Sequence, residues 1–131
     1  MTRVLLIDDD ETLRGVIKMS LTSFGFDVTE AGDGRVGVNL AKSTPFDVVV
    51  TDLIMPGQEG IETITILRRE LPHLPVIAMS GGLPNSALYL EIAAKIGARR
   101  VLGKPFAMAD LRTAITEIVQ PAKPAAPTDP A

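Results

Sequence analysis

Polar residues that can bind a divalent cation or a phosphoryl group follow four short apolar runs of the chain. The apolar runs are VLLI at 4–7, VVVT at 48–51, VIAM at 76–79 and VLG at 101–103. The polar residues that follow them are Asp8, Asp9 and Asp10, then Asp52, Ser80 and Lys104. Carboxylates are ligands that Mg²⁺ favours, and an ammonium group or a hydroxyl binds phosphoryl oxygens. Brought together, these residues would form one site for phosphoryl chemistry.

The carboxylates predict a metal site. Asp8 and Asp9 follow one apolar run and Asp52 follows another. Clustered carboxylates raise one another's pKa unless a cation lies among them. An open site of oxygen ligands suits Mg²⁺, which keeps several waters and shares its ligand shell with phosphate. Asp10 instead precedes a helical pattern, where Asp is a common N-cap, and we expect it to have only that role.

Asp52 is the candidate nucleophile. A carboxylate can attack phosphorus and hold the phosphoryl group as a mixed anhydride when the charge on the equatorial oxygens is neutralised. Lys104 can supply a positive charge, and the Ser80 hydroxyl can donate a hydrogen bond. Each residue alone is a weak signal, and their joint position after successive apolar runs makes the prediction specific.

Five strands and five helices must position these residues. We predict strands at Arg3–Asp8, Asp27–Ala31, Asp47–Asp52, Pro75–Ser80 and Arg99–Gly103. Continuous apolar strands are typical of parallel sheets with helices on both faces, and ligands bind at the carboxyl ends of such strands. The residues with helical spacing between the strands are Leu13, Ile17, Leu21 and Phe24; Val36 and Leu40; Ile61, Ile64, Leu67 and Leu71; Leu88, Ile92 and Ile96; and Leu111, Ala114, Ile115 and Ile118.

This alternation predicts an α/β fold, a (βα)5 doubly wound sheet of five parallel strands. In the order 2-1-3-4-5 the first and third strands are neighbours, so Asp8, Asp9 and Asp52 would face one another. The structural domain is expected to span residues 1–120. Residues 121–131 have a proline at every third position, which predicts a disordered tail or a linker stub.

Composition excludes several classes of function. The chain has 131 residues and a net charge of −3, which gives no basic surface for nucleic acid. It has no cysteines, so thiolate chemistry is excluded. The first apolar run is too short for a signal peptide or a membrane span, and we expect a cytoplasmic protein.

Four motifs carry a resemblance to a known family. They are IDDD at 7–10, TDLIMPGQEG at 51–60, MSGG at 79–82 and GKPF at 103–106. Over about 120 residues the chain resembles a stand-alone response-regulator receiver domain of two-component signalling, with the flavodoxin-like fold of the chemotaxis receivers. The resemblance implies a phosphorylation-activated regulatory protein that catalyses only its own phosphotransfer and slow dephosphorylation. The phosphoryl donor would be a histidine kinase or a phosphotransfer protein.

The resemblance also implies a role for each site residue. Asp52 would accept the phosphoryl group, and Ser80 and Lys104 would contact it. Asp9 and Asp52 would bind Mg²⁺ directly together with the main-chain carbonyl of Ile54, and Asp8 would bind it through water. The Lys104–Pro105 bond would be cis. A downstream protein target would dock on the face formed by the fourth helix, the fifth strand and the fifth helix.

Three positions depart from the family pattern. Val101 lies three residues before the lysine, where the family usually has the Tyr or Phe of its switch. Signalling is therefore expected to depend on backbone shifts of the loop that begins with Gly81 and Gly82. Ile54 and Gly82 have no polar side chain to position an attacking water, so we expect slow to moderate self-dephosphorylation.

The sequence leaves other readings open. A Mg²⁺-dependent phosphohydrolase with an aspartate nucleophile would use an Asp-x-Asp pair, which Asp8 and Asp10 match superficially. Such enzymes need a cap region, and the chain offers none, while Asp52 would be unexplained. A receiver that works without phosphorylation is disfavoured because every acceptor-site residue is present. A flavin-binding module is disfavoured because three acids crowd the place of a phosphate.

Overall fold

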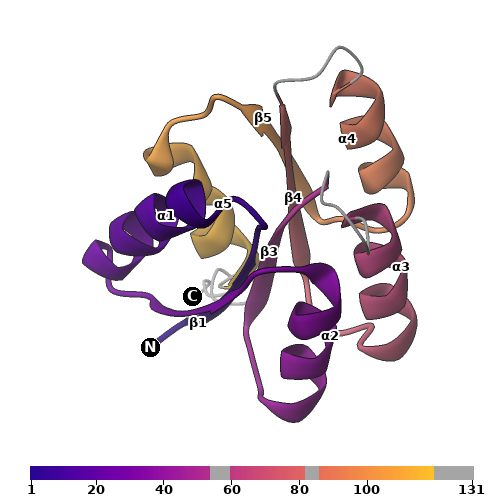
Figure 1. Cartoon of the computed structure of the whole chain (residues 1–131), viewed down its shortest axis with the longest axis horizontal. Coiled ribbons are helices and arrows are strands. Elements are labelled where there is room, and N and C mark those ends of the chain that lie inside the picture. Colours follow the sequence, from indigo (N-terminus) through magenta and orange to yellow (C-terminus); the bar gives the residue numbers. More distant parts are fainter. Residues whose placement is uncertain (54–59, 82–85, 120–131) are drawn as a thin grey trace, which may run out of the picture.

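Five strand–helix pairs alternate along the chain in the computed structural model, which describes residues 1–53, 60–81 and 86–119 (Figure 1). The strands are β1 (Arg3–Ile7), β2 (Asp27–Ala31), β3 (Val48–Asp52), β4 (Val76–Gly81) and β5 (Arg100–Lys104). The helices are α1 (Glu11–Ser23), α2 (Gly34–Ser43), α3 (Gly60–Glu70), α4 (Ser86–Lys95) and α5 (Met108–Val119).

The strands form one parallel sheet in the order β2-β1-β3-β4-β5, which confirms the predicted topology. The strand bounds differ from the predicted ones by one residue at most, and β2 agrees at both ends. Pro75 falls outside β4 because proline has no N–H to donate to a neighbouring strand, although its carbonyl accepts a hydrogen bond from Val49 at 3.0 Å. The predicted βα alternation is therefore present throughout the described chain.

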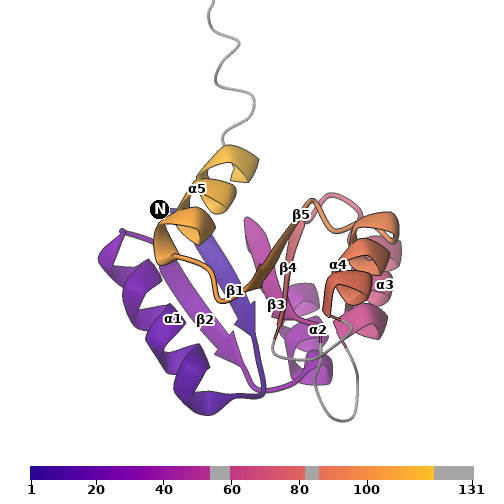
Figure 2. The ribbon, with the colours of Figure 1, turned by 90° about the horizontal axis from the view of Figure 1, so that it is seen from above.

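Two apolar cores cover the two faces of the sheet. Helices α1 and α5 pack on one face, and α2, α3 and α4 pack on the other (Figures 1 and 2). In β1, Val4 and Leu6 join the first core while Leu5 and Ile7 join the second, and all four are fully buried. This alternation follows from the period of two in a strand. The sheet is thus covered by packed helices on both faces.

Two of the predicted apolar stripes begin at exposed residues. Val36 in α2 is 45% exposed and Leu88 in α4 is 54% exposed. In α2 the buried positions are instead Val38 and the small residues Gly34, Gly37 and Ala41, because this helix lies very close to the sheet. The stripe of α5 is buried as predicted, at Leu111, Ala114, Ile115 and Ile118.

Local signals in the sequence set the ends of several elements. Asp10 is the N-cap of α1, as predicted, and its carboxylate accepts a hydrogen bond from the Leu13 N–H at 3.0 Å. Gly25 and Gly97 follow α1 and α4 with φ angles of 98° and 118°, values that glycine adopts without strain. The Lys104–Pro105 bond is cis, as the family resemblance implied.

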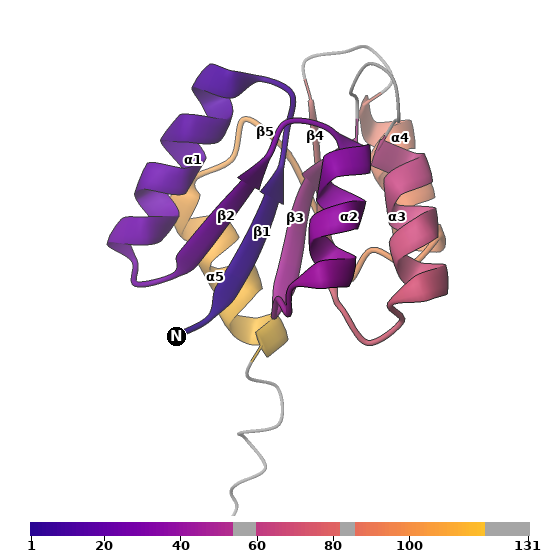
Figure 3. The ribbon, with the colours of Figure 1, turned by 60° about the horizontal axis from the view of Figure 1, so that its bottom comes forward.

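The carboxyl ends of the strands lie along one edge of the sheet. In Figure 3 the strands β1, β2 and β3 run upward, and β1 leads into α1 at the upper edge. The predicted site residues follow or end the strands at this edge. Within the described ranges, no helix is long and apolar enough to cross a membrane.

Candidate functional site

Three carboxylates meet at the carboxyl ends of β1 and β3. Asp8 and Asp9 directly follow β1, and Asp52 is the last residue of β3, the neighbouring strand. One carboxylate oxygen from each of Asp8, Asp9 and Asp52 lies within 4.8 Å of the others. The parallel pairing therefore brings together acids that are 43 or more residues apart in the chain.

Asp8 is the buried member of this cluster. Its exposed fraction is 0%, and its Oδ1 accepts a hydrogen bond from the Asp10 N–H at 3.0 Å. Its Oδ2 has no hydrogen-bond partner among the described residues. Burial raises the pKa of Asp8 to about 6, with smaller contributions from the nearby Asp52 and Asp9 carboxylates, against the lowering effects of the Asp10 N–H and Lys104. The charged form of Asp8 is therefore disfavoured, and a cation beside the open oxygen would stabilise it.

Lys104 provides one positive charge at the site. Its Nζ lies 3.5 Å from Oδ2 of Asp52 and 3.8 Å from Oδ2 of Asp8. Lys104 ends β5, and β4 separates β5 from β3, so the lysine side chain reaches across one strand. One ammonium beside three carboxylates leaves the cluster negatively charged, which favours binding of a further cation.

Ser80 lies on β4, the strand between Asp52 and Lys104. In the sheet register Met79 pairs with Asp52, and Gly81 pairs with Lys104. Ser80 is fully buried, and its Oγ has no hydrogen-bond partner among the described residues. A buried hydroxyl without a partner is costly, so Ser80 is suited to donate a hydrogen bond to a bound anionic group.

The main chain around Asp52 is tightly held. The Thr51 hydroxyl donates a hydrogen bond to the Asp52 carbonyl at 3.1 Å, and the Leu53 N–H donates to the Met79 carbonyl at 2.9 Å. Gly60 begins α3 and donates its N–H to the Leu53 carbonyl at 3.0 Å. A side chain at Gly60 would meet the Asp52 carbonyl oxygen and the Leu53 Cα. Glycine at this position therefore lets α3 start directly against the end of β3.

These residues fit a bound metal ion. The candidate ligands are carboxylate oxygens, which suit hard cations, and Oδ2 of Asp8 has no hydrogen-bond partner among the described residues. A cation with several remaining water ligands would neutralise the carboxylates and leave room for a phosphoryl oxygen. The acidic cluster is thus a site that can hold a metal ion.

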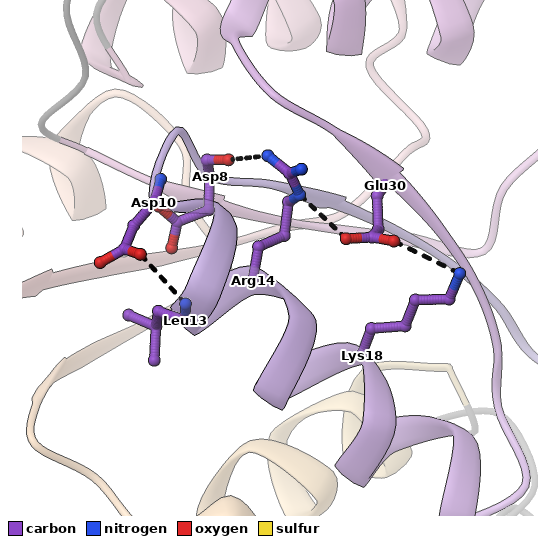
Figure 4. Close-up of polar contacts among 6 residues, drawn as sticks. All are labelled: Asp8, Asp10, Leu13, Arg14, Lys18 and Glu30. Atoms are coloured by element: carbon purple, nitrogen blue, oxygen red, sulfur yellow. Dashed lines mark hydrogen bonds and ion pairs between the residues drawn. The ribbon is translucent and has the colours of Figure 1, made fainter.

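The structure brings together most of the residues predicted for the site. Asp8, Asp9, Asp52 and Lys104 converge, and Ser80 lies on the strand between them. The Asp10 carboxylate caps α1 and is not part of the acidic cluster (Figure 4). The phosphohydrolase hypothesis, which needs both Asp8 and Asp10 at the site, therefore lacks its second acid. The predicted carbonyl ligand of Ile54 lies outside the described residues, as does Gly82 of the predicted switch loop.

Val101 occupies the position that the family usually gives to an aromatic residue. It is half-buried in β5 and packs against the core that α2, α3 and α4 share. One residue near the site was not singled out from the sequence. Arg14 of α1 donates a hydrogen bond to the Asp8 main-chain carbonyl at 2.7 Å, and nothing in the local sequence signals a contact with a main-chain atom.

Comparison with known proteins agrees with this geometry. Residues 4–116 match the response regulator receiver domain family. The chain is 36% identical over 121 residues to the chemotaxis protein CheY-3 of Vibrio cholerae, covering 90% of this chain and 92% of that protein. It is 35% identical to the chemotaxis protein CheY of Pseudomonas aeruginosa, covering 90% of this chain and 96% of that protein.

Solved structures have the same fold. A response regulator receiver domain protein from Clostridium thermocellum superposes with a TM-score of 0.87 at 30% identity, covering 94% of this chain and 98% of that one. The receiver domain of the Francisella response regulator 1452 superposes with a TM-score of 0.85 at 31% identity, covering 94% and 100%. These matches do not favour the phosphohydrolase reading. The chain belongs to the response regulator receiver domains, the phosphorylation-activated switches of two-component signalling.

Proposed function

We propose that Asp52 is the phosphoryl acceptor of this receiver and that Asp8, Asp9 and Asp52 hold the Mg²⁺ ion that the reaction needs. The convergence of three carboxylates with the Lys104 ammonium at the strand ends is the observation that supports this assignment most directly. The main-chain carbonyl of Ile54 is proposed as a further ligand. Mg²⁺ in this position would neutralise charge on the phosphoryl oxygens.

In the proposed step, a carboxylate oxygen of Asp52 attacks the phosphorus atom of the donor. The new bond is an acyl phosphate, and the bond from phosphorus to the donor nitrogen breaks. The electron pair of that bond returns to the imidazole of the donor histidine. No proton needs to leave Asp52, because the group is a carboxylate and not a carboxylic acid when it attacks.

Lys104 and Ser80 are proposed to bind the transferred group. The Lys104 ammonium lies 3.5 Å from Asp52 Oδ2 and carries a full charge on a flexible stem, so it can follow a phosphoryl oxygen. The Ser80 hydroxyl is buried on the adjacent strand without a hydrogen-bond partner among the described residues, which supports its role as a donor to the same group.

The protein's partners follow from its family. Receiver domains take phosphoryl groups from histidine kinases or phosphotransfer proteins, and we propose the same class of donor here. We also propose that a downstream protein docks on the α4–β5–α5 face and that the chain catalyses only its own phosphotransfer and slow dephosphorylation. The receiver is proposed to comprise residues 1–120, with 121–131 as a tail. The cytoplasmic location expected from the sequence stays a prediction.

The direct test is phosphorylation by a small-molecule donor. The protein is incubated with acetyl phosphate and Mg²⁺, and the intact mass is measured for the wild type, Asp52→Asn and Asp10→Asn. We expect one phosphoryl adduct on the wild type and on Asp10→Asn, and none on Asp52→Asn. Asp10→Asn is a matched control because Asn is an equally good N-cap and Asp10 is outside the acidic cluster.

Two outcomes would contradict the proposal. If the wild type gains no base-labile adduct in the presence of Mg²⁺, the acceptor chemistry is wrong. If Asp52→Asn is labelled as fully as the wild type, the chemistry stands but another residue is the acceptor.

A further inference from the structure

Arg14 joins α1 to the turn that carries the acidic cluster. Its Nη1 donates a hydrogen bond to the Asp8 main-chain carbonyl at 2.7 Å, and its Nε donates to Oε1 of Glu30 at 2.9 Å (Figure 4). The Arg14 side chain is only 15% exposed. Both donors belong to one rigid, planar guanidinium group. The position of Glu30 on β2, which fixes Nε, therefore also determines where Nη1 points.

The Asp8 main chain is held from both sides. Its N–H donates a hydrogen bond to the Ala31 carbonyl at 3.1 Å, and its carbonyl accepts from Arg14. Its Oδ1 accepts from the Asp10 N–H at 3.0 Å. These three contacts leave Oδ2 as the one Asp8 oxygen without a hydrogen-bond partner among the described residues. The position of Oδ2, which lies 3.8 Å from the Lys104 Nζ at the site, therefore depends on how the Asp8 main chain is fixed.

Glu30 keeps Arg14 in place. It accepts from Arg14 and also forms an ion pair with Lys18, at 3.3 Å between Nζ and Oε2 (Figure 4). The hydrogen bond from Arg14 is the main cause that lowers the pKa of Glu30, so the carboxylate is charged at neutral pH. A Cβ atom at Gly32 would lie 3.3 Å from Nη1 of Arg14, which leaves the guanidinium little room on that side.

We propose that Arg14 is a positioning residue of the metal site. By holding the Asp8 main-chain carbonyl, it orients the Asp8 carboxylate toward the cation and thereby sets the affinity for Mg²⁺. It touches neither the phosphoryl group nor the metal. This inference rests on the proposed function, because it requires the acidic cluster to bind Mg²⁺. Groups that orient the direct ligands of a metal typically change metal affinity by about 10- to 100-fold when they are removed.

Mg²⁺ affinity is the measurement that tests this role. Isothermal titration with MgCl₂ is carried out on the full chain as the wild type, Arg14→Met, Arg14→Lys and Lys18→Met. Lys18→Met is a matched control because it removes the other cation that pairs with Glu30, one turn further along α1, and does not touch Asp8. Thermal unfolding without Mg²⁺ shows that each variant is folded at the temperature of the titration.

We expect Arg14→Met to weaken Mg²⁺ binding by about 10-fold or more. The Mg²⁺ affinity of Arg14→Lys should lie between those of Arg14→Met and the wild type, since one ammonium cannot donate to both Asp8 and Glu30 in the same geometry. Lys18→Met should stay within about twofold of the wild type, because the contact with Asp8 is intact. At saturating Mg²⁺, labelling of Arg14→Met by acetyl phosphate should return most of the way to the wild-type rate.

The failure of this inference differs from the failure of the proposed function. A folded Arg14→Met protein with wild-type Mg²⁺ affinity, beside a wild type that is labelled on Asp52, would overturn the positioning role alone. An equal loss of affinity in Lys18→Met would also overturn it, because the effect would then belong to the anchoring of α1 in general. If Arg14→Met does not fold, Arg14→Lys decides the question by the same comparison. A wild type that binds no Mg²⁺ would overturn both proposals.

Discussion

Neighbouring residues of this chain differ sharply in their environment. Asp8 is fully buried whereas Asp9, the next residue, is exposed. Oδ2 of Asp8 is shielded from water and has no hydrogen-bond partner in the part of the chain that the structure describes, and the pKa of Asp8 is raised to about 6. In the metal-free protein the charged form of Asp8 is therefore unfavourable, and a bound cation would relieve it.

The raised pKa of Asp8 predicts a pH dependence of stability without metal. The folded state keeps the proton up to a pH of about 6, while the unfolded chain loses it near the ordinary value of 3.8. Between these values the folded state binds more protons, so the free energy of unfolding falls as the pH rises through this window. The total loss is about 3 kcal/mol, roughly half of it above pH 5.

Asp8→Asn should remove this loss, since an amide does not ionise. Urea unfolding with EDTA at pH 5 and pH 8, on either side of the pKa of about 6, measures it for both proteins. We expect the difference between the free energies of unfolding, Asp8→Asn minus wild type, to be larger at pH 8 than at pH 5 by about 1 to 2 kcal/mol. An equal change with pH in both proteins would show that Asp8 titrates normally.

At the scale of elements, the distance between α2 and β1 depends on a glycine. A Cβ atom at Gly37 would meet the fully buried side chain of Ile7, with its Cγ1 only 2.7 Å away. Gly15 on α1 is exposed, and a Cβ atom there would meet nothing within 4 Å. Gly37 is therefore required by close packing, whereas a side chain at Gly15 would be tolerated.

Replacing these glycines by alanine should change stability in opposite directions. Gly37→Ala is expected to lower the free energy of unfolding by about 1 to 3 kcal/mol, because the fully buried Ile7 side chain would have to shift. Gly15→Ala is expected to raise it by about 0.5 to 1 kcal/mol, because alanine favours the helix. Urea unfolding of both variants is the measurement. A Gly37→Ala protein with the same free energy of unfolding as the wild type would contradict this expectation, because it would mean that α2 can shift outward at no cost.

Gly60 at the start of α3 should affect chemistry as well as stability. A methyl group there would meet the Asp52 carbonyl oxygen and the Leu53 Cα, which are main-chain atoms and cannot rotate away. Gly60→Ala should therefore displace Asp52 and slow its labelling by acetyl phosphate at saturating Mg²⁺, by up to about 100-fold if the carboxylate moves by about 1 Å. Gly15→Ala is the control, and an unchanged labelling rate in a folded Gly60→Ala protein would contradict the expectation.

For the whole molecule, the proposed metal site links parts that are distant in the chain. Asp8 and Asp9 follow β1, and Asp52 ends β3, so a bound cation ties two central strands to each other and to the start of α1. The unfolded chain does not hold these carboxylates together. Binding of Mg²⁺ must therefore favour the folded state.

The gain in stability on addition of Mg²⁺ can be calculated from its affinity. At a free Mg²⁺ concentration ten times the dissociation constant, the free energy of unfolding should rise by about 1.4 kcal/mol. Urea unfolding of the wild type, with and without Mg²⁺, measures this gain, and Asp9→Asn is expected to lose most of it. Asp9 is exposed, so the variant should stay folded without Mg²⁺, and the loss of its repulsion with Asp8 should not destabilise it. The same gain in Asp9→Asn would place the ion elsewhere.

Much of this protein was predictable from local patterns. The apolar runs predicted the five strands and the βα alternation, since buried parallel strands are continuous in apolar residues. Asp10 was recognised from cap chemistry, which depends only on nearby backbone atoms. Four of the site residues that now lie together were identified because parallel strands end at one edge of the sheet.

Only the tertiary structure decided the features that depend on distant atoms. Val36 and Leu88 have the right helical spacing yet are exposed, because the closeness of each helix to the sheet, and not its pattern alone, selects the buried face. The burial of Asp8 and its contact with Arg14 arise where α1 and β2 pack beside the first strand. The sequence by itself determined which groups are available and which strand ends carry them. The packing of distant elements determined which of these groups are desolvated and how they are oriented.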